Sequence, residues 1–240
     1  MSWFANWFNS PYYHTLYKNR DEKEAEFFIE NLVQYLNLKK RSKLLDIACG
    51  KGRHAKHFNS LGLDVVGIDL SPNSITASKK YKNKTLQFFE HDMREVYKKN
   101  QFDVATNLFT SFGYFEKDSD EQKAINAMAS NLKKEGILVI DFMNAKNVIA
   151  NLVASEQKII DGITFDISRK VVNQHIIKDI HITDSKTEHH FQEKVKTLIL
   201  ANFSDFITNA GLKIIDIFGN YKLEKFNAQT SSRLILICKK

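Results

Sequence analysis

Short apolar runs alternate with amphipathic helical patterns along residues 43–144, and this alternation constrains the fold more than any other feature. Several runs suit strands that are buried on both faces, and the segments between them repeat apolar residues at helical spacing. A strand–helix–strand succession predicts right-handed crossovers and a parallel, doubly wound α/β sheet. The expected strands are KLLDIACG (43–50), DVVGIDL (64–70), LQFFEHD (86–92), FDVATNLF (102–109) and ILVIDFMN (137–144).

The expected helices carry start and stop signals. Asp21 can cap a helix with Glu24 three residues later, and Ser71-Pro72 supplies an N-cap followed by a proline. A helix over 118–134 is expected to end with Lys133-Lys134 in its last turn and Gly136 just beyond. Further helices are expected over 52–62 and 202–210, and strands over 212–219 and 232–240 return the chain to the sheet.

Between residues 150 and 200 the pattern changes to alternation of apolar and polar residues, with turn signals at Asn173-Gln174 and Asp184-Ser185-Lys186. Period two with short turns predicts an antiparallel meander with one solvated face. We interpret the meander as an insertion into a single domain spanning 1–240. Its parts would be an N-terminal arm and helix (1–40), a ligand-binding core (41–145), the meander (150–200) and a C-terminal helix with the last two strands (201–240).

The composition is that of a globular protein, with 43% hydrophobic and 26% charged residues in a chain of 240. No stretch approaches the roughly 20 apolar residues that cross a bilayer, and the aromatic N-terminus does not resemble a secretory signal. Two distant cysteines favour neither a disulfide framework nor a zinc cluster, so a cytoplasmic location is expected. The net charge of +7 comes largely from dispersed lysines, which favours a solvated surface over a nucleic-acid patch.

The segment DIACGKGR (46–53) joins the first expected strand to a helix through a glycine turn. Ligands of open α/β sheets bind at the carboxyl ends of the strands, where this turn lies. Gly50 and Gly52 lack a Cβ, so the backbone can adopt positive φ and approach a ligand closely. The glycine spacing alone also fits a dinucleotide-binding fold, or a tight turn that binds nothing.

Three acids at the ends of three successive strands narrow the choice of ligand. Asp69 lies about 20 residues after Gly50, where a carboxylate can accept hydrogen bonds from both ribose hydroxyls. Asp92 can accept from an exocyclic adenine amine. Asp46 precedes the first glycine and would repel the pyrophosphate of a dinucleotide, whereas it suits the ammonium and sulfonium of S-adenosylmethionine. The three acids therefore favour S-adenosylmethionine as the cofactor.

These segments resemble the class I S-adenosylmethionine-dependent methyltransferases, in LLDIACGKGRHA (44–55), VVGIDLS (65–71), FFEHDMRE (88–95) and FDVATNLFTSFGYF (102–115). The resemblance covers residues 40–145. It implies a Rossmann-like seven-stranded sheet, mostly parallel with its last strand antiparallel, into which the two C-terminal strands fit. FTSFGYF and the meander look like those of bacterial small-molecule methyltransferases. The resemblance assigns to the cofactor Asp46, Ala48, Gly50, Gly52, Arg53, Asp69, Leu70, Asp92, Met93 and Asn107.

No catalytic residue is demanded by the sequence, because in-line methyl transfer mainly needs alignment of acceptor, methyl carbon and sulfur. The candidates are His189, His190 and Glu193 on the meander, and Tyr114 after the fourth strand. Strand histidines are more commonly just exposed, and aromatic residues over 109–115 fit core packing equally well.

The N-terminal residues Tyr12, Tyr13, Tyr17 and Arg20 can form a lid, with Arg20 or a tyrosine reaching the cofactor carboxylate. The alternative is a packed aromatic arm that touches no ligand.

No metal site is expected. His54 and His57 lack further ligands. Asp141 and Asn144 could suggest the magnesium site of catechol-type enzymes, but Asn107 stands where such enzymes would carry an acid.

The leading hypothesis is a methyltransferase, monomeric or homodimeric, that acts on N or O of a small molecule. A nucleic-acid methyltransferase is disfavoured because residues 107–110 (NLFT) lack the Pro-Pro-aromatic sequence of base-methylating enzymes, although the basic charge leaves RNA open. Asp46 argues against a dinucleotide-dependent oxidoreductase, because its carboxylate would repel the pyrophosphate. A non-catalytic module that only binds the cofactor is the remaining alternative.

Overall fold

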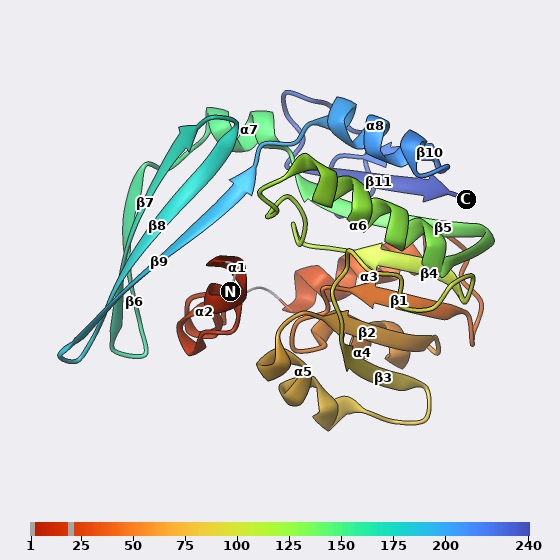
Figure 1. Cartoon of the computed structure of the whole chain (residues 1–240), viewed down its shortest axis with the longest axis horizontal. Helices are drawn as coiled ribbons and strands as arrows, with labels where there is room; N and C mark the ends of the chain where they lie inside the picture. Colours follow the sequence, from red (N-terminus) through yellow and green to blue (C-terminus); the bar gives the residue numbers. More distant parts are fainter. Residues whose placement is uncertain (1–2, 19–21) are drawn as a thin grey trace.

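The computed structural model describes residues 3–18 and 22–240, with side chains from residue 6 onward. Seven strands form one sheet in the order β10-β11-β5-β4-β1-β2-β3 (Figure 1). The pairs from β5 to β3 are parallel, and β11 runs antiparallel to both of its neighbours. The expected doubly wound sheet with a reversed last strand is therefore confirmed. Its strands are β1 (Lys43–Ile47), β2 (Asp64–Asp69), β3 (Leu86–Glu90), β4 (Phe102–Asn107), β5 (Leu132–Met143), β10 (Lys213–Phe218) and β11 (Arg233–Lys239).

Helices cover both faces of this sheet because its strands are apolar on both sides. Phe28, Phe58 and Ile75 are buried on one face, and Met128 and Phe203 on the other. The first face is covered by α3 (Glu22–Tyr35), α4 (Arg53–Ser60) and α5 (Pro72–Ser78), which continues as η1 (Lys79–Tyr81); the second is covered by α6 (Asp118–Asn131) and α8 (Leu200–Asn209). None of the described helices is both long and apolar enough to cross a membrane.

The boundary between α6 and β5 differs from the sequence prediction. α6 ends at Asn131 and the strand begins at the next residue, so Lys133-Lys134 belong to β5 and not to the last helical turn. The residue with a left-handed backbone in this segment is Glu135, with φ +66°, and not Gly136. The Lys133 ammonium lies 2.5 Å from the carboxylate of Asp103 in β4, and this cross-strand ion pair favours the strand over another helical turn.

The meander prediction is confirmed as a second, four-stranded antiparallel sheet. Its strands are β6 (Ser155–Ile160), β7 (Ile163–Val172), β8 (His175–Asp184) and β9 (Thr187–Lys196). Asn173 and Gln174 both adopt positive φ (47° and 59°), which suits the right-handed twist of a two-residue hairpin. The short helix α7 (Ala145–Ala150), which leads from β5 toward this sheet, has no counterpart in the sequence prediction.

Two short helices, α1 (Trp3–Phe8) and α2 (Pro11–Leu16), lie between the two sheets (Figure 1). Trp7 and Leu16 are buried with Phe165 and Ile180 of the four-stranded sheet in a separate apolar cluster. At the other end of β9, the Lys196 ammonium lies 2.8 Å from Glu121 and 2.7 Å from Asp118 of α6. These contacts fix the second sheet beside the carboxyl ends of the first.

Candidate active site

A cavity of about 820 Å³ lies at the carboxyl ends of β1, β2 and β3. We call it the turn cavity. It is lined by the glycine turn after β1, by the residues that follow β2 and β3, by the loop after β4, and by α1 and α2. Strand order reverses at β1, which is where ligands bind in open α/β sheets. Of the residues that the sequence assigned to a cofactor, its walls contain Ala48, Gly50, Arg53, Asp69, Leu70, Asp92 and Met93.

The two glycines of the turn are needed for different reasons. Gly50 has φ +54°, and a Cβ placed on it would meet no atom within 4 Å. Since Gly50 lines the turn cavity, that open space is room for a ligand. Gly52 has φ +80°, is not part of the wall, and a Cβ there would lie 2.6 Å from the ring of Phe88. Close packing against Phe88 therefore accounts for Gly52, which sequence reasoning had assigned to a ligand.

Asp69 is held rigidly where β2 ends. One carboxylate oxygen accepts from the backbone N–H of Gly50 and the other from the N–H of Ser71, each at 2.8 Å. Burial raises the pKa of Asp69, and these two hydrogen bonds oppose the rise. The carboxylate thus links the glycine turn to the end of β2 and keeps further acceptor positions at the wall of the turn cavity.

Asp92 does not stand alone at the end of β3, because Arg94 binds it. The Arg94 guanidinium donates to both carboxylate oxygens of Asp92. Nη2 lies 2.6 Å from Oδ2, and Nε lies 3.1 Å from each of the two oxygens. Burial alone would raise the pKa of Asp92, but the hydrogen bonds and charge of Arg94 outweigh it and lower that pKa. Arg94 also reaches Asp120 at 3.2 Å. Asp92 is therefore kept ionised as an acceptor.

Asp46 and Asn107 lie behind the wall, and neither lines the turn cavity. Asp46 is buried, and its Oδ1 accepts from the Thr106 hydroxyl at 3.2 Å. No hydrogen bond of ordinary geometry reaches Asp46 Oδ2 or Asn107 Oδ1 among the described residues. Burial raises the pKa of Asp46 to about 7, with the charge of Asp69 adding to the rise and the Thr106 hydrogen bond opposing it. An unpartnered buried carboxylate oxygen fits a cationic ligand contacted through water.

The N-terminal helices form part of the wall of the turn cavity. Tyr13, His14 and Tyr17 line it, as a lid would, and the Asn9 carbonyl oxygen Oδ1 accepts from the Ser71 hydroxyl at 2.8 Å. Arg20, expected to reach the cofactor carboxylate, and the expected cap Asp21 lie outside the described residues.

His14 is a wall residue that sequence reasoning did not identify. Burial and the charge of Lys51 lower its pKa to about 4, so its imidazole is neutral at physiological pH. Nothing in its local sequence distinguishes it from a surface histidine, because the contact with Lys51 exists only in the folded chain.

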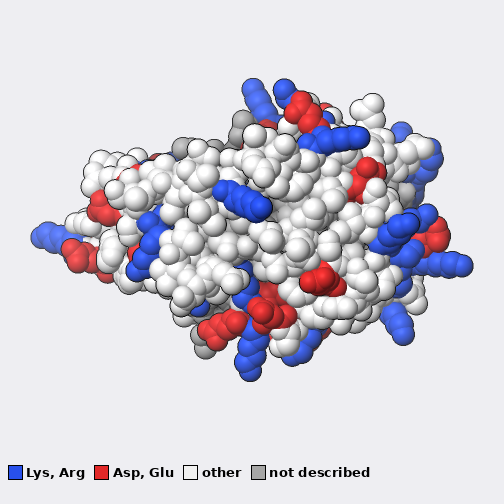
Figure 2. All heavy atoms as spheres, turned by 90° about the horizontal axis from the view of Figure 1, so that it is seen from above, with Lys and Arg blue, Asp and Glu red and all other residues white. Residues whose placement is uncertain are grey.

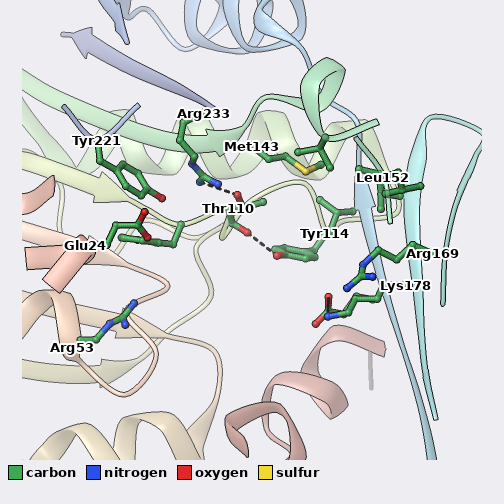
Figure 3. Close-up of a pocket in the computed structure, with 15 residues that line it drawn as sticks. Glu24, Arg53, Thr110, Tyr114, Met143, Leu152, Arg169, Lys178, Tyr221 and Arg233 are labelled. Atoms are coloured by element: carbon green, nitrogen blue, oxygen red, sulfur yellow. Dashed lines mark hydrogen bonds and ion pairs between the residues drawn. The ribbon is translucent and has the colours of Figure 1, made fainter. Parts of the chain in front are cut away.

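A second cavity of about 410 Å³ adjoins the turn cavity and opens between the two sheets (Figure 3). We call it the chamber. Its floor is apolar, with Met143, Val148, Leu152, Ile176 and Val195. Both cavities share the wall residues Arg53, Phe109, Thr110, Tyr114 and Glu193. A ligand in the turn cavity and a small molecule in the chamber would therefore meet at this shared wall.

The loop at the shared wall is strained and is held by a buried carboxylate. Phe109 and Thr110 have φ +56° and +59°, which costs free energy for residues with a Cβ. The Asp141 carboxylate accepts from the Phe109 N–H at 2.7 Å and from Arg233 Nε at 2.8 Å. Arg233 also donates to the Thr110 hydroxyl at 3.0 Å, and Tyr114 donates to the Thr110 carbonyl at 2.6 Å (Figure 3).

Asp141 is thus part of the support for this loop. Asn144 donates to the carbonyl oxygens of Ala228 and Ser231. Among the described residues, no three His, Cys, Asp or Glu side chains are grouped as a metal site would need.

Glu193 occupies the point where the N-terminal helices, β8 and the two cavities meet. Its Oε1 accepts from Trp7 Nε1 and from the Tyr17 hydroxyl, both at 2.7 Å. The Lys178 ammonium lies 3.7 Å from its Oε2 and donates to the Tyr17 hydroxyl. Lys178 was missed by sequence reasoning because a single lysine in a polar–apolar alternation is usually exposed.

The other catalytic candidates lie elsewhere, apart from Tyr114. His189 contacts the Tyr12 hydroxyl at 2.9 Å, and His190 is exposed and stacks on His181; neither lines a cavity. His54 stacks on Phe109 within the wall of the turn cavity.

His57 is half-buried, with ring nitrogens 3.8 and 3.3 Å from Glu26 and Glu30 of α3. These contacts tie α4 to α3.

Comparison with known proteins agrees with this geometry. Residues 44–136 match the model of a methyltransferase domain family. The chain is 33% identical over 101 residues to a dTDP-3-amino-3,4,6-trideoxy-α-D-glucopyranose N,N-dimethyltransferase of Streptomyces venezuelae, a match that spans 42% of this chain and 42% of that protein. It is 22% identical over 248 residues, 99% of this chain and 98% of the relative, to a protein of Geobacillus sp. that is named as a methyltransferase.

Solved structures share the whole fold. An S-adenosylmethionine-dependent methyltransferase from Clostridium acetobutylicum superposes with a TM-score of 0.80 at 18% identity, over 95% of this chain and 96% of the other. The sugar N-methyltransferase KedS8 from Streptoalloteichus superposes with a TM-score of 0.74 at 19% identity, over 93% and 90%. Residues 44–136 therefore carry a methyltransferase domain, and the chain as a whole has the fold of solved S-adenosylmethionine-dependent methyltransferases.

Proposed function

We propose that this single-domain enzyme transfers the methyl group of S-adenosylmethionine to an amino group of a small molecule bound in the chamber. The observation that carries the proposal is the shared wall between a cavity at the glycine turn and the chamber, with the Glu193 carboxylate at their junction. N-methyltransferases that act on amino sugars or on glycine and sarcosine among the relatives support an amine acceptor.

The cofactor fits the turn cavity by the chemistry of its walls. Asp69 offers acceptors for the ribose hydroxyls, Leu70 and Met93 offer apolar contact for the adenine, and Asp92 accepts from its amine. The open side of Gly50 leaves room for the ligand, and Ala48 and Arg53 flank the turn. Asp46 stabilises the ammonium from behind the wall. When bound, S-adenosylmethionine supplies an electrophilic methyl group and a thioether leaving group.

The chain's own residues orient the acceptor and exclude water. Glu193 accepts a hydrogen bond from the acceptor amine. This hydrogen bond orients the lone pair of the amine nitrogen toward the turn cavity. Phe109 and Tyr114 narrow the passage between the two cavities, and the clamp formed by Asp141 holds their loop in place. Such alignment supplies most of the catalysis that an in-line displacement requires.

The chamber's small volume argues against a polynucleotide acceptor. The face shown in Figure 2 carries basic and acidic side chains interspersed, with no continuous basic track among the described residues. On that face the basic side chains do not form a path that a nucleic acid could follow.

The test is transfer of labelled methyl groups from S-adenosylmethionine to a fractionated cell extract, with and without nuclease. We expect label in nuclease-resistant, low-molecular-weight amines. Glu193→Gln should lower kcat/KM for such an amine by about 10- to 100-fold, since the amine then meets a neutral acceptor in place of a charged one. Glu188→Gln, on the exposed part of the same strand, is the matched control and should leave turnover unchanged. Label that disappears on nuclease treatment would overturn the proposal.

A further inference from the structure

Three charged side chains form a row across the meander at the wall of the chamber. Arg169 of β7 pairs in register with Lys178 of β8, and Lys178 pairs in register with Glu193 of β9. All three line the chamber, with side-chain exposures of 18%, 11% and 14%. In Figure 3 the guanidinium of Arg169 and the ammonium of Lys178 lie side by side and point toward Tyr114. The chamber therefore has a carboxylate at its junction with the turn cavity and two cations beyond it.

Arg169 and Lys178 lie directly opposite each other, and each has one carboxylate partner, Glu156 and Glu193 respectively. Like charges on directly paired residues of neighbouring strands destabilise a sheet. Burial lowers the pKa of Lys178; the charges of Arg169 and Lys158 add to this effect, and Glu193 opposes it. Glu156 binds Arg169, but it also binds Lys158 at 3.2 Å, so one carboxylate serves two cations. The two buried cations would gain from a further anion.

We propose that Arg169 and Lys178 form an anion subsite that binds a carboxylate or phosphate group carried by the methyl acceptor. The identification of the ligand as the methyl acceptor rests on the proposed function. The binding of an anion at this subsite does not. Neighbouring strands lie about 4.8 Å apart, so the row sets amine and anion roughly 5–10 Å from each other. The acceptor class is then a small molecule that carries an amine next to Glu193 and an acidic group within that distance.

Anion binding can be measured without methyl transfer. The full chain, saturated with S-adenosylhomocysteine to fill the turn cavity, is titrated with inorganic phosphate and separately with acetate, and binding is followed by calorimetry. We expect wild-type binding in the millimolar range by at least one of the two anions. Arg169→Gln should weaken it about tenfold, as loss of a charge-assisted hydrogen bond requires. Lys178→Gln should have the same effect.

Lys170→Gln is the matched control. Lys170 is adjacent to Arg169 on β7 but is exposed, with its ammonium 3.9 Å from Asp179, so its loss removes the same charge outside the chamber. Thermal melts establish that each variant is folded. No anion binding to the wild type, or equal loss of binding in Lys170→Gln and Arg169→Gln, overturns the subsite. The comparison of phosphate with acetate shows which anionic group the site prefers.

Methyl transfer to matched amines then separates the subsite from the proposed function. Each amine is supplied with and without its acidic group, for example as an amino acid with at least three carbons between amine and carboxylate against its amide, or as amino-sugar phosphate against amino sugar. We expect the acidic member to have a kcat/KM about tenfold higher in the wild type, and equal values in Arg169→Gln. A wild-type preference for the neutral member overturns the proposal. Anion binding that depends on Arg169, without methylation of any amine, would uphold the subsite and contradict the proposed function instead.

Discussion

Gly50 and Gly162 share a left-handed backbone and open space beside the Cα, but only Gly50 lines the turn cavity. An alanine at either position costs roughly 1–2 kcal/mol, because a Cβ is unfavourable at positive φ. We therefore expect Gly50→Ala and Gly162→Ala to lower the melting temperature similarly. Only Gly50→Ala should weaken S-adenosylmethionine binding, since its methyl group fills ligand space. Equal cofactor affinity in the two variants, measured by calorimetry, would show that the turn does not hold the ligand.

Asp46 makes stability depend on pH in a direction that can be checked. Its pKa is raised by burial to about 7, above the value of an unfolded chain. Its contribution to the free energy of unfolding is therefore fully present below about pH 4 and is lost as the pH rises through about 7. Asp46→Asn does not ionise, so relative to the wild type it should gain up to about 4 kcal/mol across that window. Denaturant titrations at several pH values measure this difference, and a difference that stays flat with pH would refute the raised pKa.

At the scale of elements, α1 and α2 are the segments whose order should depend most on ligand. Each has six residues, too short to be stable alone in water, and both contribute to the wall of the turn cavity. Without cofactor, we expect amides of residues 6–17 to exchange faster than those of β1, and to slow when S-adenosylhomocysteine is added. Strand β10, at the far edge of the first sheet, is the internal control and should not respond. Equal protection of the helices and β1 without ligand would mean that they are a fixed arm and not a lid.

Elements whose signal is local could be predicted from the sequence, and elements set by tertiary contacts could not. The Ser71 cap of α5 and the Asn173-Gln174 hairpin depend on neighbouring residues, and both are present in the structure. The end of α6 depends instead on the pairing of β5 with β4 and on the ion pair between Lys133 and Asp103, which no local pattern reveals.

The residues of the candidate site differ in the same way: some could be placed from local sequence signals, and others depend on tertiary contacts. Asp69 and Asp92 could be placed at the cavity because strand ends converge at one edge of a parallel sheet. Lys178 and Arg169 could not, because their role depends on the register of the meander and on its position beside the core. Tyr114 and Glu193 both lie on the wall shared by the two cavities. On β9, His190 lies on the opposite face from Glu193, whereas His189 lies on the same face but four residues nearer the β8–β9 turn.

At the scale of the whole molecule, the second sheet and the N-terminal helices convert an open cofactor fold into two joined cavities. The first sheet alone presents its strand ends to solvent, and the four-stranded sheet closes the side on which an acceptor would approach (Figure 1). The Lys196 ion pairs with α6 fix this arrangement from one end, and the contacts of Trp7 and Tyr17 with Glu193 fix it from the other.

Calorimetric titration of the wild type with S-adenosylmethionine and with NAD tests the identity of the ligand most directly. We expect S-adenosylmethionine to saturate one site below millimolar concentration and NAD to give no binding heat. Asp69→Ala should weaken S-adenosylmethionine binding by about 10- to 100-fold, while Asp64→Ala, at the opposite end of β2, should leave it unchanged. NAD binding, or wild-type affinity in Asp69→Ala, would contradict the assignment of the turn cavity to a sulfonium cofactor.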